Sequence, residues 1–385
     1  MKDIEDWLLK KGRLIPDALI FVNELCRKLN ETGIPISRLR IGFRTIHPQM
    51  EFWAYTWTES EGIPRLWGGE HGISSSASYY GSPAEWVHQH HAIFRRRLNS
   101  LDPKTDHEVL FEQAALGFTD YVMLPLDFSD GSAAIISYVT NTGNGFSESQ
   151  LADLERLIGF IGPIIEVHAT RKIAISLLDT YIGHRSGAKV MNGNIQRGDG
   201  EIIKAALWFS DLRNYSGMSE QYDKEEIFSL LNTYFQTISD IIGKHHGEIL
   251  KFIGDAVLVI FPVDEDINST MACTAALTAA QESFEQFKHQ NTERRDQTKP
   301  EIQFGIGLHF GQVIFGNVGA IDRLDFTVIG PAVNLTSRLE ELTKQTGDPL
   351  LISEEFADNL KISSKLVGKF HLKGIQEIQQ VYTVI

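Results

Sequence analysis

Two aspartates stand at positions from which they could bind a metal ion together. Asp211 follows a short apolar run, residues 205–209, that is typical of a buried strand. Asp255 lies at the tip of a hairpin between two apolar runs, residues 248–253 and 256–261. If these strands pair, both carboxylates project from one sheet edge and suit a hard cation such as Mg²⁺, which also takes substrate phosphates as ligands. Each aspartate could equally be a turn former, and spacing alone does not separate the two interpretations.

Basic and polar side chains accompany this pair. Lys251 lies four residues before Asp255, and Asn334 and Arg338 lie four residues apart on a helix that is expected to begin at Pro331. Asn334 and Arg338 therefore share a helix face, and the planar fork of donors in arginine suits phosphate oxygens. The alternative is that Lys251 is a solvated strand lysine and that the helix face is simply exposed and polar.

The segments around these residues resemble the catalytic domain of class III nucleotide cyclases. In chain order they read FSDLR, LLNTYF, GEILKFIGDAVLVIF, FGIGLHFG and DFTVIGPAVNLTSRLE, within residues 200–385. The resemblance implies an adenylate cyclase, a phosphorus–oxygen lyase that converts ATP to 3′,5′-cyclic AMP and pyrophosphate. In this reaction the ribose 3′ oxygen attacks the α-phosphorus, and no covalent enzyme intermediate forms.

The resemblance also assigns roles to individual residues. Asp211, Asp255 and the backbone carbonyl of Leu212 would hold two Mg²⁺ or Mn²⁺ ions, which activate the 3′-hydroxyl and neutralise the leaving phosphates. Asn334 would orient the ribose, and Arg338 would stabilise the charge that develops on the α-phosphate. The family pattern places the aspartates on one protomer and the other groups on its partner, so we expect a homodimer with two active sites.

Recognition of the base and of the terminal phosphates falls to three further positions. Lys251 and Thr327 match the base-reading pair of the family, and Lys373 matches a lysine that contacts the terminal phosphates. An ammonium group only donates, so Lys251 suits the bare N1 acceptor of adenine. A hydroxyl can donate or accept, so Thr327 predicts a softer preference for ATP over GTP than an aspartate would. Lys373 could instead be a surface turn lysine.

The sequence departs from the family pattern beside FSDLR. Relatives often have Gly-Phe-Thr where this chain has Asn214, Tyr215 and Ser216. The amides of this loop are expected to face the triphosphate, and Asn is the non-glycine residue that best tolerates a positive φ. Pro331 replaces a common Asn or Asp and fits a helix start.

Helices and strands alternate through the C-terminal half, which we expect to form a ferredoxin-like α+β domain over residues 202–385. Asp223 is placed to cap a helix with Glu226 at its third position, and a second helix is expected over residues 268–289. Separate strands follow: residues 302–310, 312–315 and 324–328. The helix that begins at Pro331 should end at Gly347.

The N-terminal half is expected to be an α/β sensor domain over residues 1–160. A helix follows Pro16, extended segments occupy residues 39–46 and 51–57, and the Gly/Ser-rich residues 61–82 are predicted to be a surface loop. Asp130 and Gly131 turn a β-hairpin. Residues 121–157 resemble a GAF domain. The resemblance implies either a sensor with a small-molecule effector of unknown identity or a dimerisation module that is joined to the cyclase through the helix over residues 151–181.

A connecting segment is expected over residues 161–201. Ser147 and Gln150 form a capping box that starts a helix at Glu148, and the apolar periodicity continues to residue 181 with a kink expected at Pro163. This helix either packs on its own domain or pairs with a second copy in parallel. Turn signals then dominate residues 184–201.

Other motifs carry less weight. The histidines at 88, 90 and 91 lie in a polar segment and are expected to be solvated rather than to bind metal or haem. Residues 67–70, WGGE, resemble the Gly-Gly-Glu turn of diguanylate cyclases but lie outside the matching domain. The sequence contains no Gly-rich Walker loop, which argues against a P-loop nucleotidase.

Composition supports a folded protein of two or three domains. The 385 residues are 42% hydrophobic and 22% charged, and the net charge of −14 disfavours nucleic acid and anionic membranes as partners. Two cysteines cannot build a disulfide framework. No apolar run is long enough to span a bilayer, and the charged first residues do not resemble a signal peptide, so we expect a cytoplasmic protein. The alternatives are a cyclase that uses GTP or a pyrimidine triphosphate, and an inactive cyclase fold that serves as a dimerisation module.

Overall fold

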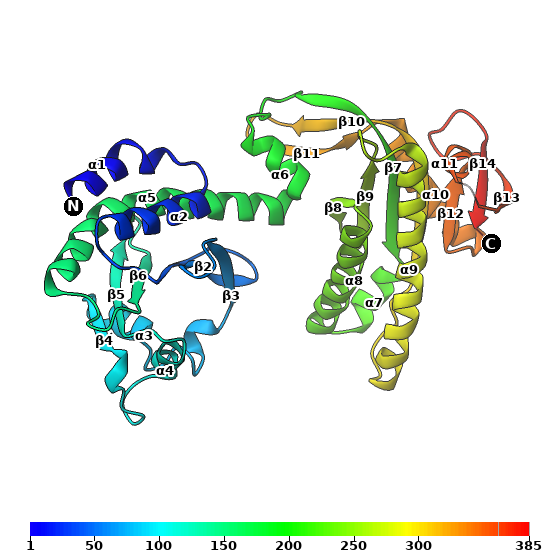
Figure 1. Cartoon of the computed structure of the whole chain (residues 1–385). Helices are drawn as coiled ribbons and strands as arrows, with labels where there is room; N and C mark the ends of the chain where they lie inside the picture. The colour runs from blue at the N-terminus through cyan, green and yellow to red at the C-terminus, as the bar shows by residue number, and fades with distance from the viewer. Residues whose placement is uncertain (361, 385) are drawn as a thin grey trace. The chain divides into compact units, whose positions relative to one another are not determined.

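The computed structural model describes residues 1–360 and 362–384 and divides into two compact units, Met1–Leu177 and Leu178–Ile385 (Figure 1). The division falls within one long helix, α5 (Glu148–Ile182). In the part of the chain that the structure describes, no helix combines the length and the apolar character that a membrane crossing requires.

The N-terminal unit is an antiparallel sheet with helices on both faces. Its strands lie in the order β3-β2-β1-β6-β5-β4. Their bounds are β1 (Arg38–Arg44), β2 (Met50–Thr58), β3 (Arg65–Glu70), β4 (Phe94–Arg97), β5 (Asp120–Asp127) and β6 (Ala133–Thr140). The helices are α1 (Lys2–Lys10), α2 (Ala18–Glu31), α3 (Pro83–His90), α4 (Glu108–Ala115) and α5 as far as Leu177, with short 3₁₀ turns at Gly12–Leu14, Ile73–Ser75 and Leu98–Ser100.

Alternation along β1 separates the two faces of this sheet. Leu39, Ile41 and Phe43 are buried in the core formed with α1, α2 and α5, whereas Arg40 points to the opposite face, which α3 and α4 cover. The first half of α5 contributes buried residues such as Leu154 to that core. This part of the helix therefore packs on its own domain, which was one of the two arrangements expected for it.

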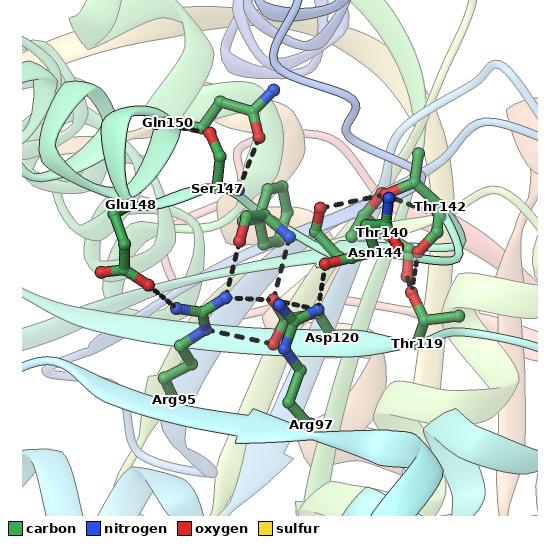
Figure 2. A network of polar contacts seen from close by, with 12 residues as sticks. Arg95, Arg97, Thr119, Asp120, Thr140, Thr142, Asn144, Ser147, Glu148 and Gln150 are labelled. Atoms are coloured by element: carbon green, nitrogen blue, oxygen red, sulfur yellow. Dashed lines mark hydrogen bonds and ion pairs between the residues drawn. The ribbon is translucent and has the colours of Figure 1, made fainter.

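A buried carboxylate fixes the start of α5 to the sheet. Asp120 is completely buried and accepts a 2.9 Å hydrogen bond from the backbone N–H of Phe146. It lies 3.0 Å from Arg95, and Figure 2 shows this ion pair. Arg95 also lies 2.7 Å from Glu148, the first residue of α5. The capping box is confirmed, because Ser147 N–H donates to Gln150 and Gln150 N–H donates to Ser147 Oγ.

The prediction of an uninterrupted loop at residues 61–82 is wrong, because β3 lies within it. β3 pairs with β2 through registers such as Trp67↔Ala54. Its two glycines disfavour a strand locally, but the backbone hydrogen bonds of a partner distant in sequence compensate. The WGGE motif is therefore part of a strand.

The C-terminal unit contains the expected ferredoxin-like core. Its strands lie in the order β13-β14-β12-β10-β7-β9-β8, with β11 paired to β10. The strands are β7 (Gly200–Leu212), β8 (Glu248–Ile253), β9 (Ala256–Pro262), β10 (Phe304–Gly319), β11 (Leu324–Ile329), β12 (Leu350–Ser353), β13 (Ser364–Phe370) and β14 (Gln379–Val384). The helices are α6 (His184–Met191), α7 (Tyr215–Gln221), α8 (Lys224–Lys244), α9 (Ser269–Asp296), α10 (Pro331–Thr346) and α11 (Glu354–Asn359). The inner order β10-β7-β9-β8 with α8 and α9 in the connections is the βαββαβ arrangement.

Helices cover both faces of this second sheet. On one face, α8 and α9 lie side by side and bury Trp208, Tyr234 and Phe287 (Figure 1). On the other face, α10 packs so closely that a Cβ on Gly307 of β10 would lie 2.5 Å from the backbone nitrogen of Glu340. A residue larger than glycine would push the helix away from the strand.

Two expectations for this unit are wrong. Residues 184–191, where turn signals dominate, form α6, and residues 304–319 form one strand where the sequence suggested a break at Gly311. β10 pairs with β7 continuously from Phe304↔Leu212 to Gly316↔Gly200, so ladder hydrogen bonds support the glycines that local propensity disfavours.

Candidate active site

The two aspartates meet at the end of the β7–β9 pair. The register Asp211↔Ala256 places Asp255, one residue earlier, beside Asp211. Burial, and then the negative charge of Asp211, raise the pKa of Asp255 to about 6. The carboxylates therefore face each other closely enough to repel, and a cation between them would relieve that repulsion.

Lys344 of α10 lies against this pair. Its Nζ is 2.7 Å from Oδ2 of Asp211 and 3.9 Å from Oε2 of Glu340. Burial alone would lower the pKa of Lys344, but the hydrogen bond to Asp211 and the charge of Glu340 outweigh burial and raise it. Sequence reasoning missed Lys344, because nothing in its spacing from Arg338 indicates that it reaches a strand end.

Arg213 and Glu340 complete the charged groups around Asp211. Glu340 is 3% exposed, and burial raises its pKa to about 7, with Lys344 opposing and Asp211 adding to the shift. Arg213 lies 3.4 Å from Glu340 and donates to Thr343 Oγ1. Its guanidinium occupies the space that a Cβ on Gly305 would need, at 2.2 Å. Gly305 pairs with Asp211 across the β10–β7 ladder, and its lack of a side chain leaves space for the guanidinium of Arg213.

The oxygen donors at this strand end fit a hard divalent cation. Asp211 and Asp255 supply carboxylates, and Leu212, the last residue of β7, adds a backbone carbonyl beside them. Within residues 1–360 and 362–384, no group of three or more His, Cys, Asp or Glu residues gathers as a metal site. A cation here would therefore need water or substrate oxygens to complete its coordination, as an active-site magnesium does.

Lys251 lies on β8 and is paired with a residue that the sequence did not single out. Its Nζ is 2.6 Å from Oδ2 of Asp325 on β11. Thr327, two residues further along β11 and therefore on the same side of that strand, is 9% exposed. The structure thus brings both predicted base-reading residues to one region, with Asp325 as an additional acceptor.

Arg338 lies on a different side of α10 from the residue that contacts the aspartates. Arg338 pairs with Glu341 at 2.6 Å, and Asn334, one turn earlier, is exposed. At about 100° per residue, Arg338 lies roughly 120° around α10 from Lys344, which contacts Asp211. Within one chain, Arg338 is therefore directed away from the group around Asp211.

Comparison with known proteins identifies the family of the C-terminal unit. Residues 200–385 match the model of the adenylate and guanylate cyclase catalytic domain. These residues belong to that family. The chain is 38% identical over 197 residues to an adenylate cyclase of Anabaena cylindrica, covering 50% of this chain and 38% of that protein. It is 32% identical over 181 residues to adenylate cyclase 1 of Rhizobium meliloti (strain 1021), covering 46% of this chain and 27% of that protein.

A solved structure of a bacterial light-regulated adenylyl cyclase shares the fold. It has a TM-score of 0.51 at 22% identity and covers 69% of this chain and 85% of that chain. This chain spans well under half the length of the two curated relatives.

The positive φ expected at Asn214 is confirmed. Its φ is 55°, in the left-handed region, and α7 begins at the next residue. Lys373, by contrast, is exposed between β13 and β14 and has neither a hydrogen bond nor an ion pair within the described residues. Within the described residues, Lys373 therefore pairs with none of the other predicted site residues.

The histidines of the N-terminal unit have separate environments. His88 Nδ1 lies 2.9 Å from the phenol oxygen of Tyr79, His90 stacks on Trp86, and His91 lies 2.9 Å from Asp127. His88 is half-buried rather than solvated, but the described residues hold it in no metal-binding group.

Proposed function

We propose that the cyclase domain converts ATP to 3′,5′-cyclic AMP and pyrophosphate. The observation that carries this proposal is the pair Asp211 and Asp255, which face each other at the end of adjacent strands. Two Mg²⁺ or Mn²⁺ ions bound by these carboxylates and the Leu212 carbonyl would activate the 3′-hydroxyl and neutralise the leaving phosphates. The reaction then depends mainly on positioning and on electrostatic stabilisation.

The remaining residues recognise ATP and stabilise its transition state. Lys251 donates to N1 of adenine, Thr327 hydrogen-bonds the base edge, and Asn334 orients the ribose. Arg338 directs its fork of donors at the α-phosphate as charge develops there. Lys373 pairs with the terminal phosphates.

A homodimer is the assembly that joins the two groups of residues. The placement of Arg338 and Lys344 on different sides of α10 supports a site that takes its aspartates from one copy and Lys251, Thr327, Asn334 and Arg338 from the other. A two-fold dimer of this kind has two active sites. We propose that residues 1–160 form a GAF-like regulatory domain, that residues 161–201 connect it to the catalytic domain at 202–385, and that the protein acts in the cytoplasm.

Product analysis tests the reaction. The full chain is incubated with ATP, GTP, CTP or UTP and Mg²⁺ or Mn²⁺, and products are identified by mass spectrometry. Cyclic AMP from ATP is the expected main product. If cyclic GMP dominates, the roles given to Lys251 and Thr327 are wrong, and a cyclase of different base preference is the better proposal. If no substrate yields a cyclic nucleotide, the domain is an inactive dimerisation module.

A further inference from the structure

A cavity of about 290 Å³ lies in the N-terminal unit, away from the residues assigned to the cyclase reaction. Its floor is the face of the sheet opposite the α1, α2 and α5 core, and its walls come from α3, α4 and the segment that follows β3. The volume suits a small organic molecule.

Arg40 of β1 is the unusual group in this cavity. It lies opposite Ser137 of β6 in the middle of the sheet. Within the described residues, its guanidinium has neither an ion pair nor a hydrogen bond. It lies over two aromatic faces, with Trp67 at 5.0 Å and Phe52 at 5.9 Å from ring centroid to Cζ. A half-buried cation without an acidic partner is costly, and burial lowers the pKa of Arg40 accordingly. The charge of Arg38 adds to the cost of placing it here.

None of the carboxylates that line the cavity forms an ion pair with Arg40 in the described residues. The Glu51 carboxylate accepts from Ser74 and from the backbone N–H of Gly72 at 2.9 Å. Two further glutamates line the cavity from α4, but Glu108 and Glu112 are exposed and neither reaches Arg40 within ion-pair distance. Burial, and then the charge of Arg44, lower the pKa of His88, which keeps that ring neutral near pH 7.

The aromatic side chains beside Arg40 give the cavity an apolar wall. Phe52 and Trp67 meet edge to face, with 6.1 Å between ring centroids. A Cβ on Gly42 would lie 2.3 Å from Cζ of Phe52, so this glycine lets the phenyl ring lie across β1. Trp67 is 46% exposed, which leaves part of the indole face available to a ligand.

We propose that this cavity binds a small organic anion whose carboxylate or phosphate pairs with Arg40 and whose flat apolar part lies along Phe52 and Trp67. Arginine pairs with both oxyanions through two parallel hydrogen bonds. The proposal is independent of the proposed cyclase reaction, because binding can be measured without nucleotide or metal.

A panel of matched compounds tests the ligand class on the full chain. Benzoate, 2-naphthoate and phenyl phosphate are compared with benzamide, 2-naphthamide and phenol by calorimetry and by tryptophan fluorescence. We expect at least one anion to bind, and its neutral counterpart to bind at least tenfold more weakly. Comparing the affinities of the two carboxylates with that of phenyl phosphate shows which oxyanion the cavity prefers. If no anion in the panel binds, or if the neutral compounds bind equally well, the proposal is wrong.

Substitutions locate the site. Arg40→Met should weaken binding of the anion at least tenfold, Arg40→Lys should weaken it less, and Trp67→Leu should remove the fluorescence change. Arg65→Met is the matched control, since Arg65 lies on β3 of the same sheet, does not line the cavity and has a 74% exposed side chain. Should Arg40→Met fail to fold by circular dichroism, Arg40→Lys and Trp67→Leu decide the question. Unchanged affinity in the folded variants would overturn the assignment.

Discussion

The Nζ of Lys344 lies 2.7 Å from Oδ2 of Asp211. A lysine ammonium thus contacts one of the two carboxylates that we propose as metal ligands. In this arrangement Lys344 offsets part of the negative charge of Asp211 and Asp255. A divalent cation that binds Asp211 must compete with this ion pair.

Replacing Lys344 should therefore strengthen metal binding. In Lys344→Met the carboxylates have no competing ammonium, and we expect the dissociation constant for Mn²⁺, measured by electron paramagnetic resonance without nucleotide, to fall by about threefold to tenfold. Lys365→Met, on the exposed surface of β13, is the matched control and should leave it unchanged. Unchanged or weaker Mn²⁺ binding in Lys344→Met would show that the ion pair does not compete with metal.

Complementation tests the shared site. Asp211→Ala and Arg338→Ala should each be inactive as homodimers, because each lacks one group in both sites. An equal mixture should recover about one quarter of the wild-type activity, since about half of the dimers are mixed and each has one intact site. Cyclic AMP formation is measured after heterodimers are verified by differential tagging. Absence of recovery in verified heterodimers contradicts the two-chain site.

Base preference should respond to the residue at position 327. Thr327→Asp supplies a carboxylate that accepts from the adenine amino group, so the ratio of kcat/KM for ATP to that for GTP should rise about tenfold. Thr327→Ser keeps the hydroxyl and should leave the ratio near the wild-type value. Steady-state kinetics with both nucleotides measure the change, and a ratio that falls in Thr327→Asp speaks against contact with adenine.

His309 should make stability depend on pH. This β10 residue is 6% exposed, and burial lowers its pKa to about 4, with Glu355 opposing the shift. Because the folded pKa lies below the unfolded value, the contribution to stability is complete above about pH 6.5 and is lost as the pH falls to about 4. The loss should be about 3 kcal/mol of unfolding free energy.

Urea unfolding between pH 7 and pH 4 measures this dependence. His309→Gln should flatten the pH profile relative to the wild-type chain. His289→Gln is the control, because His289 has a 75% exposed side chain. If the unfolding free energy of His309→Gln depends on pH in the same way as that of the wild type, the prediction is wrong and other groups cause the dependence.

The packing of α10 on β10 should tolerate no side chain at Gly307. In Gly307→Ala the new Cβ would lie 2.5 Å from the backbone of Thr336 and Glu340, and we expect a loss of about 1–3 kcal/mol in unfolding free energy. Gly243→Ala, in α8, meets no atom within 4 Å and should change stability by less than about 1 kcal/mol, in the stabilising direction. Equal midpoints in urea for both variants would contradict the close packing.

Local signals predicted much of both units. The Ser147–Gln150 capping box, the cap at Asp223 and the positive φ at Asn214 depend on residues close in sequence, and the structure contains all three. The hairpin that carries Asp255 follows from a two-residue turn between apolar runs. Its neighbour Asp211 was expected at the same sheet edge because both residues follow directly from strand ends.

Pairings between distant segments were not predictable in the same way. β3 and the continuous β10 exist because a partner strand supplies hydrogen bonds that outweigh weak local propensity. Residues 184–191 form a helix where the sequence predicted turns.

The sequence by itself determined which residues we propose for the chemistry. Their types, their positions at strand ends and on helix faces, and the motifs around them can all be read from short stretches of chain. Only the tertiary structure decided their partners. Lys344 and Asp211 are 133 residues apart, and Lys251 and Asp325 are 74 apart, so no local spacing could join them. The cavity around Arg40 has the same origin, since sheet pairing and the covering helices bring its walls together from segments that have no periodic relation in the chain.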